Sequence, residues 1–175
     1  MNNIAADVNN RGQVAGLSDL ADDTTAHAFL WQDGVMTDLG TLPGDVFSLA
    51  SGMNNKGQIV GQSCDQMGKC RAFLWENGVM TDLNTLIPSV SSLSLIFGSK
   101  INDRGEISGQ TYDPNTGDTS AFLAIPCDAE HTDDQGCQAA AQASAAVERP
   151  RVVLPENVRK LLQQRVRFGR FGMGR

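Results

Sequence analysis

The chain carries two nearly identical copies of a fifteen-residue segment, and this duplication limits its fold more than any other feature. The first copy, residues 28–42, reads AFLWQDGVMTDLGTL, and the second, residues 72–86, reads AFLWENGVMTDLNTL. A second motif repeats in step, as VNNRGQVAG at 8–16, MNNKGQIVG at 53–61 and INDRGEISG at 101–109. The period is 45 residues and then 48. Repeats of this length indicate a propeller, a solenoid or another tandem array.

Each unit is expected to form four short antiparallel strands. The tetrads NNRG, NNKG and NDRG are turn sequences, because Asn, Asp and Gly tolerate the left-handed backbone region. A second turn follows at QDG in the first unit and ENG in the second. The strands expected in the second unit are residues 49–53, 58–62, 71–75 and 79–83. The residues expected to carry the turns are Gly34, Asn54, Gly57, Gly78, Asn102 and Gly105. Four strands in this length match one propeller blade.

The strand motif FLW places large apolar side chains on both faces of one strand, since neighbouring residues point to opposite sides. Both faces are therefore expected to be buried between neighbouring sheets, with Phe29, Phe73, Trp31 and Trp75 at equivalent core positions. We predict an all-β fold of tandem four-stranded antiparallel units, β-propeller-like, with about three blades and an incomplete ring. A parallel β-solenoid is the competing architecture, although its coils are usually shorter.

The third unit is eroded. Its strand motif survives only as AFLAIP at 121–126, which loses the tryptophan and the fourth strand. Three units are fewer than the 4 to 8 blades typical of a closed propeller. Two interpretations stay open: the chain is part of a longer array, or the missing blades come from a second copy, which makes a homo-oligomer.

These motifs resemble those of the HAF repeat family, a group of probable extracellular repeat proteins of bacteria. His27-Ala28-Phe29 with Leu30, Trp31 and Gly34 matches the motif that names the family, and LGTLPG and NNKGQIVG match its other landmarks. The resemblance covers residues 4–126, although the second copy has Arg71 in place of His. It implies a secreted repeat protein and supplies no catalytic residue.

Composition divides the chain into three regions. Residues 1–126 form the repeat domain, with units at about 1–44, 45–88 and 89–126, and residues 127–147 form a Cys-bracketed loop with an Ala/Gln-rich segment. Residues 148–175 form a basic amphipathic tail that is helical or disordered. From residue 147 on there are eight Lys or Arg and two Glu, which leaves six basic and eighteen acidic residues in the remainder. The body at −12 and the tail at +6 are electrostatically opposite.

The four cysteines form two close pairs, expected as the disulfides Cys64–Cys70 and Cys127–Cys137. Paired cysteines favour an oxidising, extracellular or periplasmic compartment, although the chain begins without a signal peptide. A metal site built from these thiols and His131 is the rival, but the spacings are wider than those of zinc knuckles. Free thiols in a cytosolic protein are the third reading.

The tail is expected to contact an acidic surface, and the nearest one is the protein's own body. An anionic membrane is a second possible contact, and nucleic acid is disfavoured because the body repels phosphate. The candidate contact residues are Arg159, Lys160, Arg165, Arg167 and Arg170.

Catalytic signatures are scarce, and we expect no catalytic residue, cofactor or metal. The chain has two histidines, and His27 is expected to be a structural part of the repeat. The predicted function is a secreted non-catalytic module that binds or scaffolds, with itself, an extracellular polymer or a protein as partner. The alternatives are a remnant of a secreted propeller enzyme acting on polysaccharide, and a carrier of the cationic tail.

Overall fold

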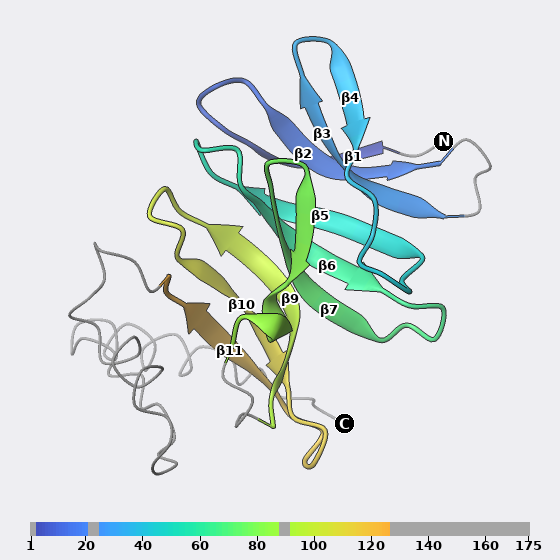
Figure 1. The fold of residues 1–175 in the computed structure, drawn as a ribbon, viewed down its shortest axis with the longest axis vertical. Coiled ribbons are helices and arrows are strands. Elements are labelled where there is room, and N and C mark those ends of the chain that lie inside the picture. The colour runs from blue at the N-terminus through green and yellow to red at the C-terminus, as the bar shows by residue number, and fades with distance from the viewer. Residues whose placement is uncertain (1–2, 21–24, 88–91, 127–175) are drawn as a thin grey trace, which may run out of the picture. The chain divides into compact units, whose positions relative to one another are not determined.

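The computed structural model describes residues 3–20, 25–87 and 92–126, which form three antiparallel β-sheets (Figure 1). Every described residue belongs to the unit Met1–Ser144, the first of two units into which the chain divides. The fold is all-β in this part, as the repeats predict, and the three sheets do not close into a ring.

Each sheet corresponds to one sequence repeat, and each strand pairs with the next strand along the chain. The first sheet contains β1 (Asn3–Val8), β2 (Val14–Asp19), β3 (Ala26–Gln32) and β4 (Val35–Asp38). The second contains β5 (Phe47–Met53), β6 (Ile59–Cys64), β7 (Cys70–Glu76) and β8 (Val79–Asp82), followed by the short 3-10 helix η1 (Leu83–Thr85). The third contains β9 (Ser94–Ile101), β10 (Ile107–Tyr112) and β11 (Thr119–Ala124). Among the described residues the third sheet lacks a fourth strand, as its eroded motif predicts.

Two apolar cores join the three sheets. The core between the first and second sheets consists of Ala15, Ala28, Leu39, Leu42, Ala50, Met53, Ile59 and Phe73, with Leu30, Trp75 and Met80 packed against it. The core between the second and third sheets consists of Val60, Ala72, Leu83, Leu95, Ile101 and Ile107, with Leu74, Ile87, Phe122 and Ala124 packed against it. The second sheet is therefore buried on both faces, which explains why β7 is apolar at consecutive positions.

Alternate residues of the repeated strands give every sheet two distinct faces. We call one the aromatic face, which carries Phe29 and Trp31 in β3, Phe73 and Trp75 in β7, and Phe122 in β11. The opposite, aliphatic face carries the remaining motif residues: Ala28 and Leu30 in β3, Ala72 and Leu74 in β7, and Ala121 and Leu123 in β11. In both cores, the aliphatic face of one sheet packs against the aromatic face of the next.

The two tryptophans of the repeat have different environments. Trp75 is partly buried against the first core, whereas Trp31 is 37 % exposed. The prediction that both are mostly buried is therefore wrong for Trp31. Its aromatic face belongs to the first sheet, which no earlier sheet covers among the described residues. Phe29 and Phe73, by contrast, are both buried as predicted.

Hydrogen bonds between tetrad turns tie the sheets together. The Asn54 side chain accepts from the backbone N–H groups of Lys56 and Gln58, both at 3.0 Å. It donates to Gln58 Oε1 at 2.6 Å and to the Asn102 carbonyl at 2.9 Å. Asn9 donates in the same way to the Asn54 carbonyl at 3.0 Å. The bonds form a ladder in which each unit's asparagine reaches the next unit.

The tetrads take the left-handed conformation only at their last residue. The φ angles of Gly12, Gly57 and Gly105 are 73°, 85° and 82°. The expectation that Asn also adopts this region is wrong for the tetrads, where Asn serves as a hydrogen-bonding group. It holds in the shorter hairpin turns, where Asp33 and Asn77 have φ of 50° and 52° ahead of Gly34 and Gly78. Two successive positive φ values are the signature of a type I′ turn.

The first strands of the three sheets lie close together. Asp7 on β1 accepts from the Met53 N–H on β5 at 3.0 Å and from Lys100 Nζ on β9 at 2.9 Å. A Cβ atom added to Gly52 would lie 2.8 Å from the Ser99 carbonyl oxygen of β9, so only glycine fits there. A single carboxylate thus connects strands from all three sheets.

Several predictions fall outside the described residues. They concern the Cys127–Cys137 pair, the Ala/Gln-rich segment within 127–147, the helical or disordered tail at 148–175, His131, and the tail contacts of Arg159, Lys160, Arg165, Arg167 and Arg170. In the described part of the chain, no helix is long and apolar enough to cross a membrane.

Candidate functional site

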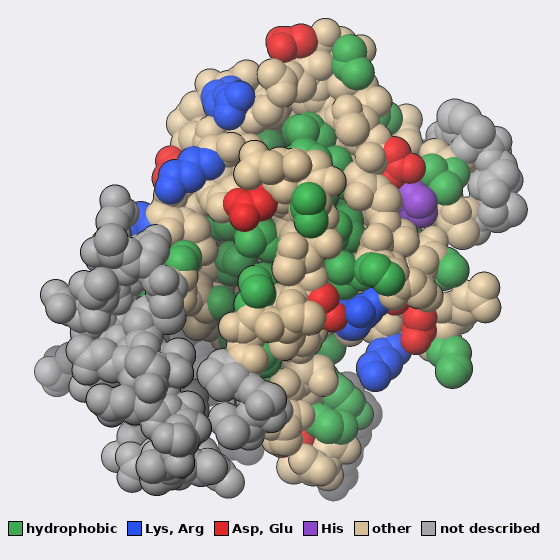
Figure 2. Space-filling model, in the orientation of Figure 1, with side chains coloured by type: hydrophobic (Ala, Val, Ile, Leu, Met, Phe, Trp, Pro, Cys, Tyr) green, Lys and Arg blue, Asp and Glu red, His purple; other side chains and the backbone are tan. Residues whose placement is uncertain are grey.

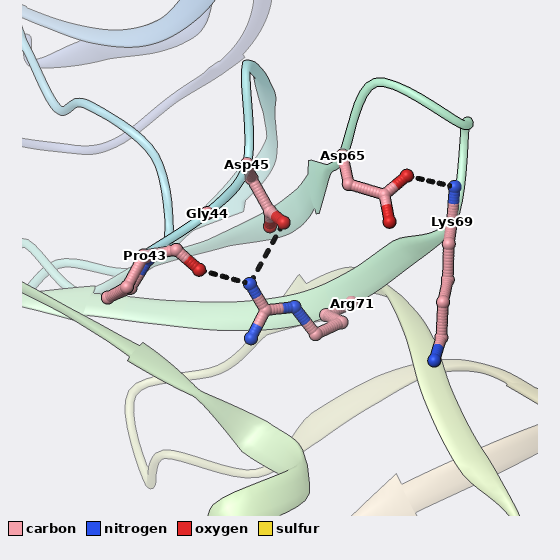
Figure 3. A pocket seen from close by; sticks show the side chains of 6 residues that line it. All are labelled: Pro43, Gly44, Asp45, Asp65, Lys69 and Arg71. Carbon is pink, nitrogen blue, oxygen red and sulfur yellow. Dashed lines mark hydrogen bonds and ion pairs between the residues drawn. The ribbon is translucent and has the colours of Figure 1, made fainter.

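An open pocket of about 330 Å³ lies beside the second sheet. The segment that connects β4 to β5 forms one side, the turn between β6 and β7 forms another, and β7 supplies the centre (Figure 3). Its lining residues are Pro43, Gly44, Asp45, Asp65, Lys69 and Arg71. On the face of the molecule seen in Figure 2, basic and acidic side chains are interspersed rather than gathered by sign.

Arg71 organises the pocket from the start of β7. Its Nη2 lies 2.9 Å from Asp45 Oδ1 and donates to the Pro43 carbonyl at 3.1 Å, as Figure 3 shows. Its Nη1 lies 3.0 Å from Asp82 Oδ2 on β8. Burial favours loss of the proton, but the bonds and charges of Asp45 and Asp82 outweigh it and raise the pKa of Arg71 above its ordinary value. The guanidinium is therefore a fixed positive charge that joins β7, β8 and the connecting segment.

The same position in the first unit is occupied by His27. Its Nδ1 lies 3.0 Å from Asp38, the counterpart of Asp82. The strand-start residue of the repeat is thus a partner for the aspartate of the VMTD strand in both units. Arg71 is longer and bidentate, so it reaches the additional carboxylate of Asp45.

Asp45 is the most deeply buried charged group in the pocket. Its side chain is 4 % exposed, and its Oδ2 atom has no hydrogen-bond partner among the described residues. A carboxylate buried in this way depends on its cation, because an unpaired charge would pay a large desolvation cost. Asp45 and Arg71 therefore hold one another in place.

The other side of the pocket is a turn closed by a disulfide. Cys64 and Cys70 face one another across β6 and β7 and are bonded, as the sequence predicts. Asp65 Oδ1 accepts from the backbone N–H groups of Met67 at 2.9 Å and Lys69 at 3.0 Å. The turn is consequently rigid, while the Lys69 side chain is exposed at its edge.

The two carboxylates of the pocket have structural partners. Asp65 caps its turn, and Asp113 repeats that role in the third sheet by accepting from the Asn115 N–H at 2.9 Å. Asp45 is held by Arg71. The pocket thus presents a braced polar surface with one exposed ammonium group, that of Lys69.

Models of protein families, curated proteins and solved structures give no match to this chain.

The residues predicted from the repeat do not gather at this pocket. All four aromatic residues lie on the aromatic faces of their sheets, where Phe29 and Phe73 are buried, Trp75 is partly buried and Trp31 is exposed. The six residues predicted to carry turns do lie in turns: Gly34, Asn54, Gly57, Gly78, Asn102 and Gly105. Within the described ranges, no group of three or more His, Cys, Asp or Glu side chains could hold a metal ion.

Sequence reasoning missed Arg71 and Asp45 as a pair. Arg71 was noted only as a departure from the His of the motif, and the signal that could have found its partner is Asp82, which lies on the adjacent strand. Asp45 carried no signal, because its burial depends on how the connecting segment folds back over β7.

Proposed function

We propose that the protein is a secreted, non-catalytic repeat protein of the HAF type that binds an extracellular polymer through a propeller-like body. The pocket around Arg71 is the observation that carries the proposal. It combines a rigid frame with polar groups at its surface, which is what a preformed recognition site requires.

Contacts on both sides of the pocket hold its frame in place. The Arg71 guanidinium fixes the connecting segment through Pro43 and Asp45, and the disulfide between Cys64 and Cys70 closes the turn opposite. A site that is already ordered before binding loses little conformational entropy when a ligand arrives.

The disulfide also supports the proposed location. Disulfides persist in oxidising compartments and are rare in the reducing cytosol. Cys64 and Cys70 close the hairpin between β6 and β7, whose turn residues 66–69 are exposed. This fits a protein that functions in the periplasm or outside the cell.

Calorimetric titration of the whole chain with a neutral, an anionic and a cationic polysaccharide tests the proposal. We expect one of these classes to bind, and Lys69→Ala to weaken binding about fivefold or more, because the exposed ammonium borders the pocket. Lys56→Ala is the matched control, since Lys56 lies in a tetrad turn outside the pocket.

Binding of none of the three polysaccharides, or equal weakening by both lysine variants, would count against this function. Release of new reducing ends from a bound polymer would instead favour the alternative of a polysaccharide-degrading enzyme.

A further inference from the structure

Part of the aromatic face of the first sheet, around Trp31 and Met36, is a stacking surface without a partner in the described chain, whereas Phe29 on the same face is buried. Trp75 and its cross-strand partner Met80 pack against the first core, which the preceding sheet helps to build. The corresponding pair in the first sheet is Trp31 and Met36, which face one another across β3 and β4. These side chains are 37 % and 47 % exposed. The equivalent Trp–Met pair is therefore covered by a neighbouring sheet in the second sheet and exposed in the first.

The aliphatic face of the third sheet is the complementary surface. Ala121 and Leu123 on β11 occupy the positions that Ala28 and Leu30 hold on β3. In the first sheet these two residues contribute to the core that covers the Trp75 face. Leu123 is 60 % exposed. The third sheet thus exposes an aliphatic surface equivalent to the one that covers the aromatic face of the second sheet.

The ladder of tetrad turns ends in the same complementary way. The Asn54 carbonyl accepts from both the Gly57 N–H and the Asn9 side chain. At the first turn the Asn9 carbonyl accepts from the Gly12 N–H alone among the described residues. At the last turn the Asn102 side-chain amide donates to Glu106, with no following carbonyl among the described residues. One end of the ladder therefore has a spare acceptor and the other a spare donor.

We propose that a second copy of this chain stacks head to tail on the first. The Trp31 and Met36 face of one copy packs against the Leu123 face of the other, and Asn102 of one donates to the Asn9 carbonyl of the other. This contact would continue the two interfaces inside the chain, which use equivalent residues of the repeat in the same order. The contact is independent of the Arg71 pocket.

A contact of this kind is heterologous, because the two surfaces that meet are different. Repeating it either closes a ring or builds an open filament. The described residues of two copies contribute six sheets, a number within the roughly 4 to 8 blades of known propellers. A two-copy ring would pair both open faces of these described sheets.

Sedimentation velocity of the full chain, from about 1 µM to about 100 µM, tests the contact. We expect the wild-type chain to be a dimer at the upper end of this range. Trp31→Lys and Leu123→Lys should each weaken association about tenfold or more, since each places a charge in an apolar contact. The matched control is Val35→Lys. Val35 precedes Met36 on β4, lies on the opposite face of the sheet and is 64 % exposed.

Mixing the two disrupted variants separates a head-to-tail contact from any other. Each variant keeps one intact surface, so Trp31→Lys and Leu123→Lys together should form a one-to-one complex at concentrations at which neither variant associates with itself. A wild-type chain that stays monomeric throughout the range would overturn the proposal. So would a dimer that Leu123→Lys leaves unchanged, or a mixture that does not associate. Circular dichroism of each variant checks that the β-sheets are intact.

Discussion

Replacing Asn54 by alanine should destabilise the protein far more than the same change at the equivalent Asn102. Asn54 is 4 % exposed and its side chain makes four hydrogen bonds, two that hold its own turn and two as a donor. At about 0.5–1.5 kcal/mol net for each bond, the loss amounts to about 2–6 kcal/mol. Water can reach part of the opened turn, so we expect about 3 kcal/mol.

Asn102 is the matched control because its side chain has the same role in its own turn. It accepts from the Arg104 N–H at 3.0 Å and the Glu106 N–H at 3.1 Å and donates to the Glu106 carboxylate, but it is exposed and reaches no further turn among the described residues. Water replaces such bonds readily at an exposed site, so Asn102→Ala should cost about 1 kcal/mol.

Urea unfolding followed by circular dichroism measures the free energy of unfolding for both variants. A difference of about 2 kcal/mol between them would be the contribution of burial and of the bond between units. If Asn54→Ala and Asn102→Ala were equally destabilising, the ladder between turns would contribute nothing, and the reasoning would be refuted.

Three further predictions follow from the inner strands and the disulfide. Gly52→Ala should destabilise by about 1–3 kcal/mol in urea unfolding, because its Cβ would collide with the β9 backbone; an unchanged midpoint would contradict the close approach. Replacing Cys64 and Cys70 together by serine should cost about 2 kcal/mol, seen as a lower melting temperature that reductant no longer affects. Burial raises the pKa of Asp7, but the hydrogen bonds and charge of Lys100 and the backbone N–H groups outweigh it and lower the pKa below its ordinary value. The stabilisation by this carboxylate is therefore present above the pKa of Asp7 in the unfolded chain and is lost as the pH falls through its pKa in the folded protein. Asp7→Asn should make the free energy of unfolding depend less on pH in the acid range.

The repeated motifs were sufficient to predict the strands and their order. Turn chemistry at the tetrads and at Gly34 and Gly78 set the strand ends, and the apolar FLW runs indicated sheets covered on both faces. The same reasoning overestimated the burial of Trp31, because a repeated motif does not say whether another sheet packs on a given copy of it. The structure shows that Trp31 lies on a face of the first sheet that no other described sheet covers.

The pocket was beyond the reach of the sequence for a different reason. Arg71 and Asp82 could be paired from the hairpin register, since β7 and β8 are joined by a short turn. Asp45 precedes Arg71 by a whole hairpin, and its contact depends on the path of an irregular connecting segment. Local patterns determine strand pairing well, whereas the path of such a segment is set by packing.

The ladder of tetrad turns gives the array a direction, and this has an evolutionary consequence. Every unit offers a donor amide to the unit after it and an acceptor carbonyl to the unit before it, as Asn9, Asn54 and Asn102 show. A duplicated unit inserted between two others could make the same hydrogen bond with each neighbour, and removal of one unit would leave its two neighbours able to bond to each other. Such a gene can lengthen or shorten by whole repeats without inventing a new interface.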